Sequence, residues 1–410
     1  MKQFLWVGSF LTEDIFRQMV ARGYKNAASY VSQKNILEGL EHVSGISFDS
    51  VNSISMLGYP GNSCCIIPSC MYSHGQGSCD FLIGYINFLY INKYFMNQRM
   101  VSGIKSWLAT RHQKNNELHV ILYEMRSACL LAAKYIKKYV PQAKIHLIIP
   151  DLPHFMDLNM NPVKRVLKNV DIHCMLSHLK WVDDFILYTA SMAEYLKLDE
   201  RSWMLMEGSV NKADINLINQ QVILNGQTKY RKKHIILYSG AVDKRFGLDS
   251  LVRAMDHLDN SYCLWITGDG PYASELRKCV VNNSRIIYYG FLPKREDLFK
   301  LQAQAEIFIN LRKSTIQASQ YCFPSKLFEY MLWGKPVIST KLKGIPAEYW
   351  EYISSIDDLT PACIARVIAN VCQTEEAGKK ALAGRNFIIQ NKNNYAQAQR
   401  IYDFITDKRI

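Results

Sequence analysis

Four residues near the start of one predicted helix, Pro324, Ser325, Lys326 and Glu329, could together hold a nucleotide. Proline at the first helical turn leaves the backbone N–H groups of Ser325, Lys326 and Leu327 without helical acceptors, and with the helix dipole they form a site for a diphosphate. Lys326 adds positive charge, and Glu329 lies on the same side as Ser325. Its carboxylate accepts two hydrogen bonds, which suits the neighbouring hydroxyls of a ribose. The alternative is an ordinary amphipathic helix with one exposed glutamate.

The segments around this helix alternate between strand and helix. Predicted strands cover residues 235–238, 263–267, 286–289, 306–309 and 336–339. Predicted helices cover residues 249–258, 272–281, a segment that begins at Pro293, and 324–333. Alternation with such short connections is typical of a parallel, doubly wound sheet.

The N-terminal half follows the same plan less regularly. Predicted strands cover residues 3–8, 119–123, 145–149 and 185–188, and predicted helices cover 80–114, 126–139 and 161–180. A polar stretch from Glu207 to His234 separates the halves, and a last helix is expected at 394–408. The sequence therefore predicts an α/β protein with domains at 1–205 and 206–390, followed by the segment 391–410.

Composition fits two globular domains, since 49% of the 410 residues are apolar and 21% are charged. Glu13 and Asp14 end the first apolar run too early for a signal peptide, and no stretch approaches the roughly 20 apolar residues that span a bilayer. We expect a cytoplasmic protein that can attach to a membrane surface.

One cluster raises the question of a metal: Cys64, Cys65, Cys70, His74 and Cys79. Its spacing matches no zinc module that we know and lacks the short C-x2-C pair. We expect a cysteine-rich loop and no metal.

Positive charge is concentrated in one region of a chain whose net charge is +13. Residues 93–168 hold thirteen Lys or Arg against four acidic residues. Nucleic acid, an anionic membrane and a pyrophosphate-linked lipid are possible partners for such a surface. A merely solvated basic face is an equal alternative.

Several blocks resemble one known family in the same order along the chain. YCFPSKLFEYMLWGKPVIST (321–340) resembles the donor motif of family 4 (group 1) retaining glycosyltransferases of the GT-B fold. LYSGAVDKRFGLDSLVRAM (237–255), LWITGDGP (264–271) and YYGFLPKREDLFKLQAQAEIFIN (288–310) extend the resemblance. IPDLPHFMDL (149–158) and VDDFILYTASMAEYL (182–196) resemble bacterial exopolysaccharide, capsule and O-antigen enzymes. The resemblance implies two Rossmann-like domains that face each other across a cleft, with a C-terminal helix that crosses back to the first.

The resemblance also implies roles for individual residues. Donor binding falls to Gly8, Ser9, Gly240, Phe291, Leu292, Tyr321, Pro324, Ser325, Lys326, Leu327 and Glu329. Catalytic roles fall to Asp151, His154, Lys244, Arg245 and Lys326. Glu329 matches the glutamate that holds the ribose, Gly240 lies where the diphosphate passes the backbone, and the segment of Phe291 and Leu292 packs on the base.

Two positions depart from the family pattern. Tyr321 replaces a second glutamate that contacts the transferred sugar. The usual Arg and Lys after Gly240 fall on Ala241 and Phe246, with Lys244 and Arg245 beside the gap as substitutes. The sequence leaves the transferred sugar and the linkage undetermined.

The function implied is transfer of a hexose, UDP-linked in most of this family, to a polyprenyl-diphosphate-linked saccharide. Transfer would retain configuration and need neither metal nor cofactor, and nucleic acid would not be a partner. Two alternatives remain: a nucleotide-sugar 2-epimerase on the same fold, and a non-catalytic subunit of a transferase. Gly268-Asp269-Gly270 lacks the third glycine of a dinucleotide fingerprint, and the absence of an Asp-x-Asp pair disfavours the metal-dependent class.

The acceptor is expected on the N-terminal domain. The run FLIGYINFLYINKYF (81–95) joins aromatic and apolar residues and is followed by Arg99, Lys105 and Arg111. This pattern favours a helix that rests on the inner face of the cell membrane, and a buried core helix is an equal alternative.

Overall fold

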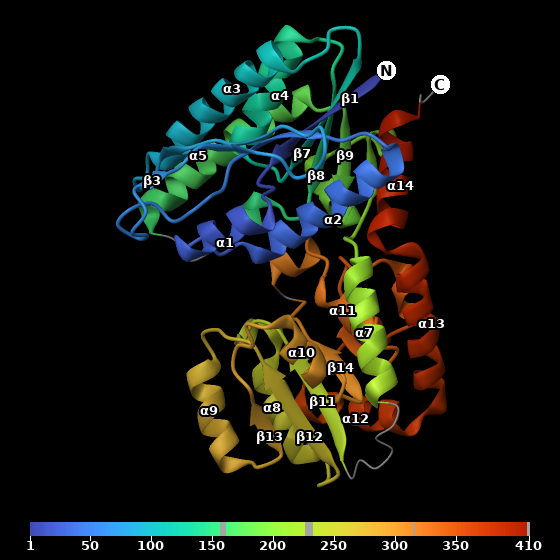
Figure 1. Ribbon diagram of the computed structural model, residues 1–410. Coiled ribbons are helices and arrows are strands. Elements are labelled where there is room, and N and C mark those ends of the chain that lie inside the picture. The colour runs from blue at the N-terminus through green and yellow to red at the C-terminus, as the bar shows by residue number, and fades with distance from the viewer. Residues whose placement is uncertain (156–160, 226–232, 315, 408–410) are drawn as a thin grey trace. The chain divides into compact units, whose positions relative to one another are not determined.

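The computed structural model describes residues 1–155, 161–225, 233–314 and 316–407, which form two compact units (Figure 1). Unit 1 contains Met1–Ser209 and the segment from Asn394 onward. Unit 2 contains Val210–Asn393. The last helix therefore belongs to the same unit as the first strand, although all of unit 2 lies between them in the sequence.

Unit 1 is built on a sheet with the strand order β10-β9-β8-β7-β1-β2-β5-β4. Its strands are β1 (Lys2–Gly8), β2 (Asp49–Asn52), β4 (Cys70–Tyr72), β5 (Asp80–Leu82), β7 (Glu117–Tyr123), β8 (Lys144–Ile149), β9 (Asp184–Leu187) and β10 (Trp203–Leu205). Neighbouring strands run parallel except for β4 and β5. A separate antiparallel pair joins β3 (Ile66–Ile67) to β6 (Tyr85–Ile86).

The helices of unit 1 follow most of these strands. They are α1 (Glu13–Ala21), α2 (Ala27–Ser44), α3 (Asn92–Thr110), α4 (Ser127–Tyr139), α5 (Pro162–His178), α6 (Ala190–Leu196) and α14 (Asn394–Thr406), with short 3-10 turns at Pro153–Phe155, Leu179–Trp181 and Glu200–Ser202. The side chain of Asn26 caps α2 by accepting from Ser29 N, and Gly45 ends that helix with a left-handed φ of 65°.

Unit 2 is built on a fully parallel sheet with the order β13-β12-β11-β14-β15-β16. Its strands are β11 (His234–Ser239), β12 (Tyr262–Thr267), β13 (Ile286–Tyr288), β14 (Ile307–Asn310), β15 (Val337–Thr340) and β16 (Ser354–Ile356). Its helices are α7 (Lys212–Asn225), α8 (Leu248–Ala254), α9 (Ala273–Asn282), α10 (Arg295–Gln302), α11 (Lys326–Met331), α12 (Pro361–Gln373) and α13 (Glu375–Asn391), with 3-10 turns at Lys244–Phe246, Met255–His257, Gln317–Gln320 and Ala347–Glu351.

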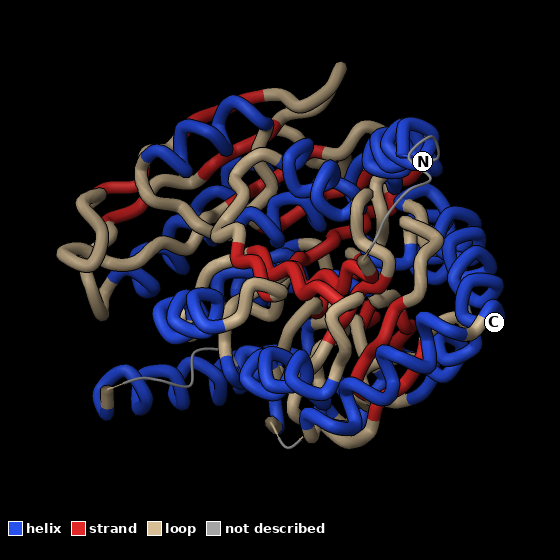
Figure 2. The backbone as a smooth tube through the Cα atoms, turned by 90° about the horizontal axis from the view of Figure 1, so that it is seen from below, coloured by secondary structure: helices blue, strands red, loops and turns tan. Residues whose placement is uncertain are grey.

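Alternation along β11 explains why helices cover both faces of this sheet (Figure 2). Ile236 and Tyr238 point into a core that α8, α9 and α12 share, whereas Leu237 points into a second core with α7, α10, α11 and α13. Successive side chains of a strand face opposite sides, so a strand buried on both faces reads as a continuous apolar run. A parallel sheet covered on both faces exposes its strand ends, and ligands of such folds bind beyond the carboxyl ends.

Three strands of unit 2 meet closely at their carboxyl ends. Gly240 N donates to Thr267 O at 3.0 Å, and Gly268 N donates to Gly290 O at 2.9 Å. A Cβ on Gly268 would lie 1.7 Å from Gly240 O, and Gly268 has a φ of +133°. Only glycine fits there, so the Gly-x-Gly of this segment allows close backbone approach and a tight turn.

Most predicted elements are confirmed, with shifts of one or two residues at their ends. The predicted helix 80–114 is wrong before Asn92, because that stretch forms β5, β6 and a loop. The helix expected from Pro293 begins at Arg295, and the polar stretch before His234 contains α7, which sequence reasoning missed. The last residue of the helix predicted at 394–408 lies outside the described ranges. None of the helices described has the combined length and apolarity needed to cross a membrane.

Candidate functional site

The helix α11 begins at Lys326, where the donor motif was expected, and lies between β14 and β15 in the chain. Ser325 occupies its cap position and Lys326 its first residue. Leu327 N donates to Pro324 O at 2.8 Å, and the Leu327 side chain is buried. The prediction of three N–H groups without acceptors is therefore wrong for Leu327.

Lys326 and Glu329 form an ion pair on this helix. Lys326 Nζ lies 3.1 Å from both Glu329 Oε1 and Oε2. Gln302 Nε2 also donates to Glu329 Oε1, and Gln302 Oε1 accepts from Trp333 Nε1 at 3.0 Å, which fixes the orientation of the amide. The Glu329 side chain is 20% exposed. Lys326 and Gln302 therefore hold the carboxylate in place from two sides, while part of the side chain still reaches solvent.

Burial on its own would raise the pKa of Glu329. The charge of Lys326, the hydrogen bond from Gln302 and the charge of Arg295 outweigh burial, so the pKa lies below its usual value. Glu329 is therefore ionised at neutral pH and can accept two hydrogen bonds from a diol.

Tyr330 attaches this helix to the end of β11. Its hydroxyl accepts from Ser239 N at 2.9 Å and donates to Ser239 O at 2.8 Å, and its ring is buried. Ser239 is the residue before Gly240. The buried hydroxyl of Tyr330 thus connects the helix predicted to bind the ribose to the loop predicted to lie against the diphosphate, and it both donates and accepts a hydrogen bond there.

The two cations of the Gly240 loop are both paired with acids. Lys244 Nζ lies 2.7 Å from Glu275 Oε2, while Arg245 donates to Asp243 Oδ2 from Nε at 2.9 Å and from Nη2 at 2.7 Å. Lys244 and Arg245 are half or more exposed. A diphosphate that used these cations would have to compete with their carboxylates.

Arg312 is a cation at this edge that sequence reasoning missed. Its guanidinium lies 5.2 Å from the ring centre of Phe246, in the Gly240 loop, and its charge acts on the phenol of Tyr238. Its backbone N–H donates to Thr340 Oγ1 at 3.0 Å, which ties it to the end of β15. The sequence signal that could have identified Arg312 is its position two residues after β14, because the carboxyl ends of parallel strands lie at one edge of the sheet.

The three remaining residues of unit 2 that were predicted to bind the donor differ in how far their side chains are exposed. Phe291 follows Gly290, whose φ is +70°, and is 70% exposed, so its ring is free to stack on a base. Leu292 packs against the core of α10 and α11. Tyr321 is half-buried, and its backbone N–H donates to Ala318 O at 3.2 Å.

Gly8 and Ser9 end β1 in unit 1 and are held by α2. Ser9 N donates to Gln33 Oε1 at 2.8 Å, and Gln33 Nε2 donates to Ser9 Oγ at 2.6 Å. A Cβ on Gly8 would lie 2.5 Å from the same Gln33 Oε1. Ser9 is buried. The structure thus gives this pair a clear structural role at the strand end, and donor contact stays a prediction.

Asp151 and His154 follow β8 at the same edge of the unit 1 sheet. Asp151 is exposed, and the ring of His154 makes an edge contact with Tyr195 at 5.0 Å. Burial, and then the nearby charge of Lys168, lower the pKa of His154. At neutral pH the imidazole is uncharged and able to accept a proton.

Glu124 and Arg126 lie at the end of β7 and were also missed. Glu124 has a left-handed φ of 72°, which is uncommon away from glycine, and its Oε1 accepts from Ser29 Oγ at 2.6 Å. Arg126 Nη1 donates to Ser53 O at 3.0 Å. Backbone strain of this kind concentrates at functional sites, and no sequence pattern revealed it.

The cysteine-rich segment, residues 64–79, contains no group of three metal-binding side chains whose ligand atoms lie close together. In the part of the chain that the structure describes, the only close group of metal-binding side chains lies elsewhere. His74 instead contacts two carboxylates, with Asp80 Oδ2 2.7 Å from Nδ1 and Glu41 Oε1 3.0 Å from Nε2. Burial would lower the pKa of His74, but the hydrogen bonds and charges of Asp80 and Glu41 raise it to about 9.

This histidine should make stability depend on pH. Because the pKa of His74 is higher in the folded state than the usual 6.5, its contribution is complete below pH 6.5 and is lost as pH rises through about 9. We expect the free energy of unfolding of the wild type to fall, by at most about 3 kcal/mol, across this window. The free energy of unfolding of His74→Gln, measured in urea at several pH values, should not show this fall. Parallel pH profiles for both proteins would contradict it.

Comparison with known proteins gives the fold and one family match. Residues 233–374, all in unit 2, match the family model described as glycosyl transferases group 1. No protein of curated function matches the chain. Among solved structures, Anabaena Alr3699/HepE in complex with UDP and glucose superposes with a TM-score of 0.64 at 11% identity and 100% coverage of both chains.

Two further structures show the same architecture. Sucrose-phosphate synthase from Thermosynechococcus elongatus has a TM-score of 0.62 at 14% identity and covers 98% of this chain and 97% of its own. The lipopolysaccharide outer core galactosyltransferase WaaB has a TM-score of 0.61 at 13% identity, with 98% and 99% coverage. The chain has the GT-B fold, which confirms the predicted fold class.

Proposed function

We propose that this protein is a glycosyltransferase that moves a hexose from a nucleotide sugar to a saccharide acceptor. The observation that carries the proposal is the Lys326–Glu329 pair on α11, inside the segment that matches the group 1 family model. An ionised, oriented carboxylate one turn from a lysine provides separate contacts for a ribose and a diphosphate. A core helix without a ligand gains little from holding this partly exposed pair at a strand end.

UDP-hexose is the donor that we propose. Solved complexes of the Anabaena protein with the same fold contain UDP, glucose and UDP-glucose, which supports this choice of donor class. Phe291 would stack on the uracil and Glu329 would accept from the ribose hydroxyls. Tyr321, in place of an acidic residue, would contact the sugar.

Transfer is proposed to retain configuration and to need no metal. As the anomeric carbon separates from the diphosphate, negative charge grows on the leaving oxygens, and preorganised cations beside them lower the barrier. Lys326, Arg312, Lys244 and Arg245 are the cations that we propose for this role. When the diphosphate binds, Lys326 would move from Glu329 toward it, and Glu329 would turn to the ribose.

A single assay tests the function. The protein is incubated with a panel of nucleotide sugars and lipid-linked saccharides, and nucleoside diphosphate release is measured. Release that requires both an acceptor and Glu329 is expected. An isomerised sugar nucleotide without acceptor would indicate a 2-epimerase. Binding without release, unchanged in Glu329→Ala, would indicate a non-catalytic subunit.

The acceptor is proposed to be a polyprenyl-diphosphate-linked saccharide of bacterial surface polysaccharide synthesis, met at the inner face of the cell membrane. The helix predicted for residues 81–95 is wrong before Asn92, where β5, β6 and a loop replace it, while contact of this run with a membrane stays a proposal. Ile86, Phe88 and Ile91 are exposed, although Leu82, Ile83 and Tyr85 are buried. Tyr90 and Tyr94 are also exposed.

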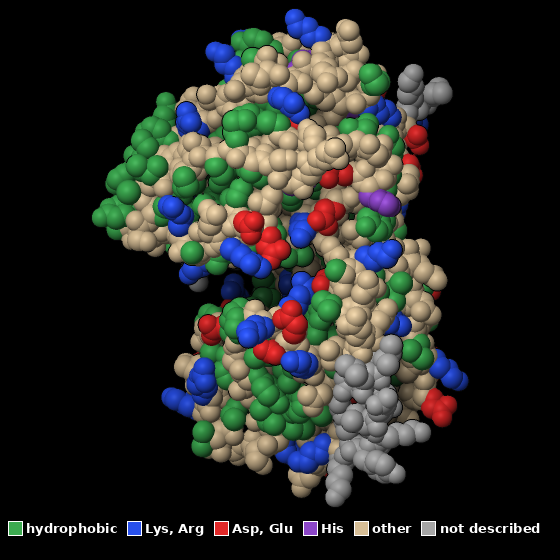
Figure 3. Space-filling model, viewed as in Figure 1, with side chains coloured by type: hydrophobic (Ala, Val, Ile, Leu, Met, Phe, Trp, Pro, Cys, Tyr) green, Lys and Arg blue, Asp and Glu red, His purple; other side chains and the backbone are tan. Residues whose placement is uncertain are grey.

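Helix α5 offers a second surface that we propose for contact with the membrane. Val163, Val166, Leu167 and Val170 recur at helical spacing and are 57%, 62%, 45% and 57% exposed. Figure 3 shows hydrophobic side chains gathered at the end of unit 1 where Figure 1 labels α5 and β3. Lys164, Arg165 and Lys168 lie between the apolar residues. An apolar stripe with flanking cations fits an anionic lipid surface, with each cation contributing about 1 kcal/mol.

We expect the protein to float with vesicles of equal parts phosphatidylcholine and phosphatidylglycerol at low salt, but not with phosphatidylcholine alone. Val166→Asp with Leu167→Asp should lower the bound fraction at least about tenfold, because two charges must enter the lipid interface. Val281→Asp with Leu382→Asp, two exposed apolar positions of unit 2, is the matched control and should float normally. Equal flotation of the two variants would contradict this role of α5.

A further inference from the structure

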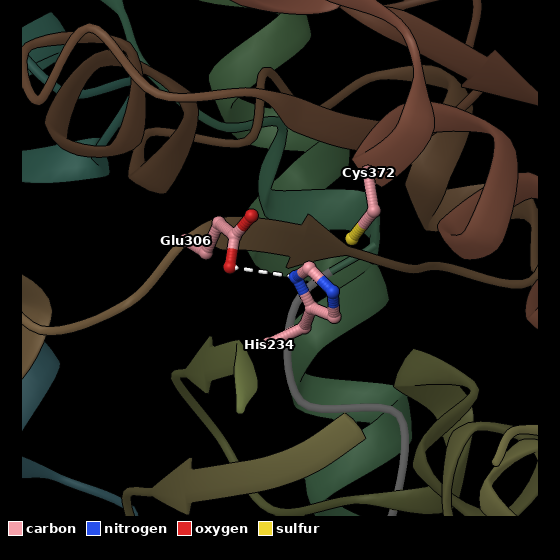
Figure 4. Close-up of side chains that lie close together, drawn as sticks. All are labelled: His234, Glu306 and Cys372. Atoms are coloured by element: carbon pink, nitrogen blue, oxygen red, sulfur yellow. Dashed lines mark hydrogen bonds and ion pairs between the residues drawn. The ribbon is translucent and has the colours of Figure 1, made fainter. Parts of the chain in front are cut away.

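Three side chains that bind transition metals converge at the end of the unit 2 sheet opposite to the donor site. His234 is the first residue of β11, Glu306 precedes β14, and Cys372 lies in the last turn of α12. Their ligand atoms all lie within 4.8 Å of one another. Figure 4 shows the three side chains pointing toward one another from separate elements. Because Ser239 and His234 end the same strand, about 17 Å separates this group from the donor loop.

The backbone holds two of the three residues in place. His234 N donates to Ser261 O at 2.7 Å, and Glu306 N donates to Ile235 O at 2.8 Å. The imidazole packs beside the buried ring of Tyr262 at 5.0 Å, and its Nδ1 lies 2.9 Å from Glu306 Oε2. The imidazole and the carboxylate therefore already meet, and the thiol approaches them from the helix.

We propose that His234, Glu306 and Cys372 bind a divalent ion of the zinc type, with water as the fourth ligand. One imidazole nitrogen, one carboxylate oxygen and one sulfur are ligands that zinc accepts, at about 2.0–2.3 Å from the metal. Donors around one tetrahedral ion then lie about 3.3–3.8 Å apart, which the observed group reaches by a small side-chain rotation. The thiolate disfavours Mg²⁺ and Ca²⁺, which prefer oxygen ligands.

Binding would change no oxidation state. The Cys372 thiol gives its proton to solvent and its sulfur bonds to the metal. The proton of the hydrogen bond between His234 and Glu306 moves to the imidazole nitrogen that does not bind the metal, and two metal–ligand bonds replace that hydrogen bond. The ion would tie β11, the approach to β14 and α12 together. It would therefore stabilise unit 2 at its amino-terminal strand ends without touching the donor.

Cobalt titration of the metal-free full chain tests the site, because a cysteine thiolate bound to Co²⁺ gives a charge-transfer absorption that oxygen and nitrogen ligands do not. One Co²⁺ per chain with this absorption is expected, displaced by Zn²⁺. Cys372→Ser should abolish the absorption, and His234→Ala and Glu306→Ala should each weaken binding at least tenfold. Cys363→Ser, on the same helix, should bind like the wild type.

A second measurement does not depend on any variant. Zinc should protect Cys372 of the unmodified protein from alkylation, with mass spectrometry identifying the cysteine, and should raise the unfolding temperature by about 5 °C at a hundredfold excess over Kd. Absorption retained in Cys372→Ser, or protection of other cysteines instead, would overturn the proposal. Absence of binding at micromolar metal would also overturn it.

Discussion

Replacing Lys326 by methionine is expected to lower kcat for sugar transfer by about 10²–10³ while donor binding weakens much less. Lys326 is the proposed cation beside the departing diphosphate, and charge on the leaving oxygens grows mainly in the transition state. Methionine keeps an unbranched side chain and removes the charge together with the hydrogen bonds to Glu329. Steady-state kinetics with saturating acceptor would measure the effect.

Two controls make this result specific. Lys326→Arg should recover much of kcat, because a guanidinium also binds phosphate oxygens. Lys278→Met removes an exposed lysine of α9 and should leave kcat unchanged. An equal loss of kcat in both methionine variants, or no loss in Lys326→Met, would contradict the assigned role.

Replacing Glu329 by glutamine is expected to raise the donor KM about ten- to a hundredfold, with a smaller change in kcat. A hydrogen bond to a charged acceptor contributes about 1.5–3 kcal/mol, and the ribose is bound in both the ground state and the transition state. Calorimetric titration with UDP should show the same loss of affinity.

The matched control for this change is Glu296→Gln, at an exposed position of α10. It should bind UDP like the wild type. If Glu329→Gln lowered kcat and left UDP affinity unchanged, Glu329 would act on the sugar or the acceptor and not on the ribose. That outcome would contradict the ribose contact while leaving transfer itself intact.

The sequence predicted strands well where an apolar run is buried on both faces, as from Ile235 to Tyr238, but it missed short strands such as β2, β10 and β16. It failed at residues 81–91, where aromatic and apolar residues lie in short strands and a loop. Gly84 shows why: a Cβ there would meet Ser69 N at 2.5 Å, so this chain turns tightly against a neighbouring segment. Such close contacts join segments that are distant in the sequence, and local periodicity does not predict them.

For the site, spacing placed Ser325 and Glu329 on one side of a helix and Lys326 beside the expected diphosphate, but it did not predict the ion pair between Lys326 and Glu329. It could not show that Gln302, far along the chain, also holds the carboxylate, or that Asp243 and Glu275 already pair with Arg245 and Lys244. Arg312 was missed because only the sheet order places β14 beside β11. Partners from different strands depend on topology, which the motif itself does not encode.

The return of α14 to unit 1 sets an order for folding during synthesis. Ala398, Ile401 and Ile405 are buried in the same core as Phe4 and Trp6. Because the ribosome releases the chain from its N-terminus, the complete sequence of unit 2 emerges before these three residues do. Unit 2 can therefore fold before unit 1 is complete, because the core residues of β1 and α2 gain their contacts with α14 only when the last segment has been made.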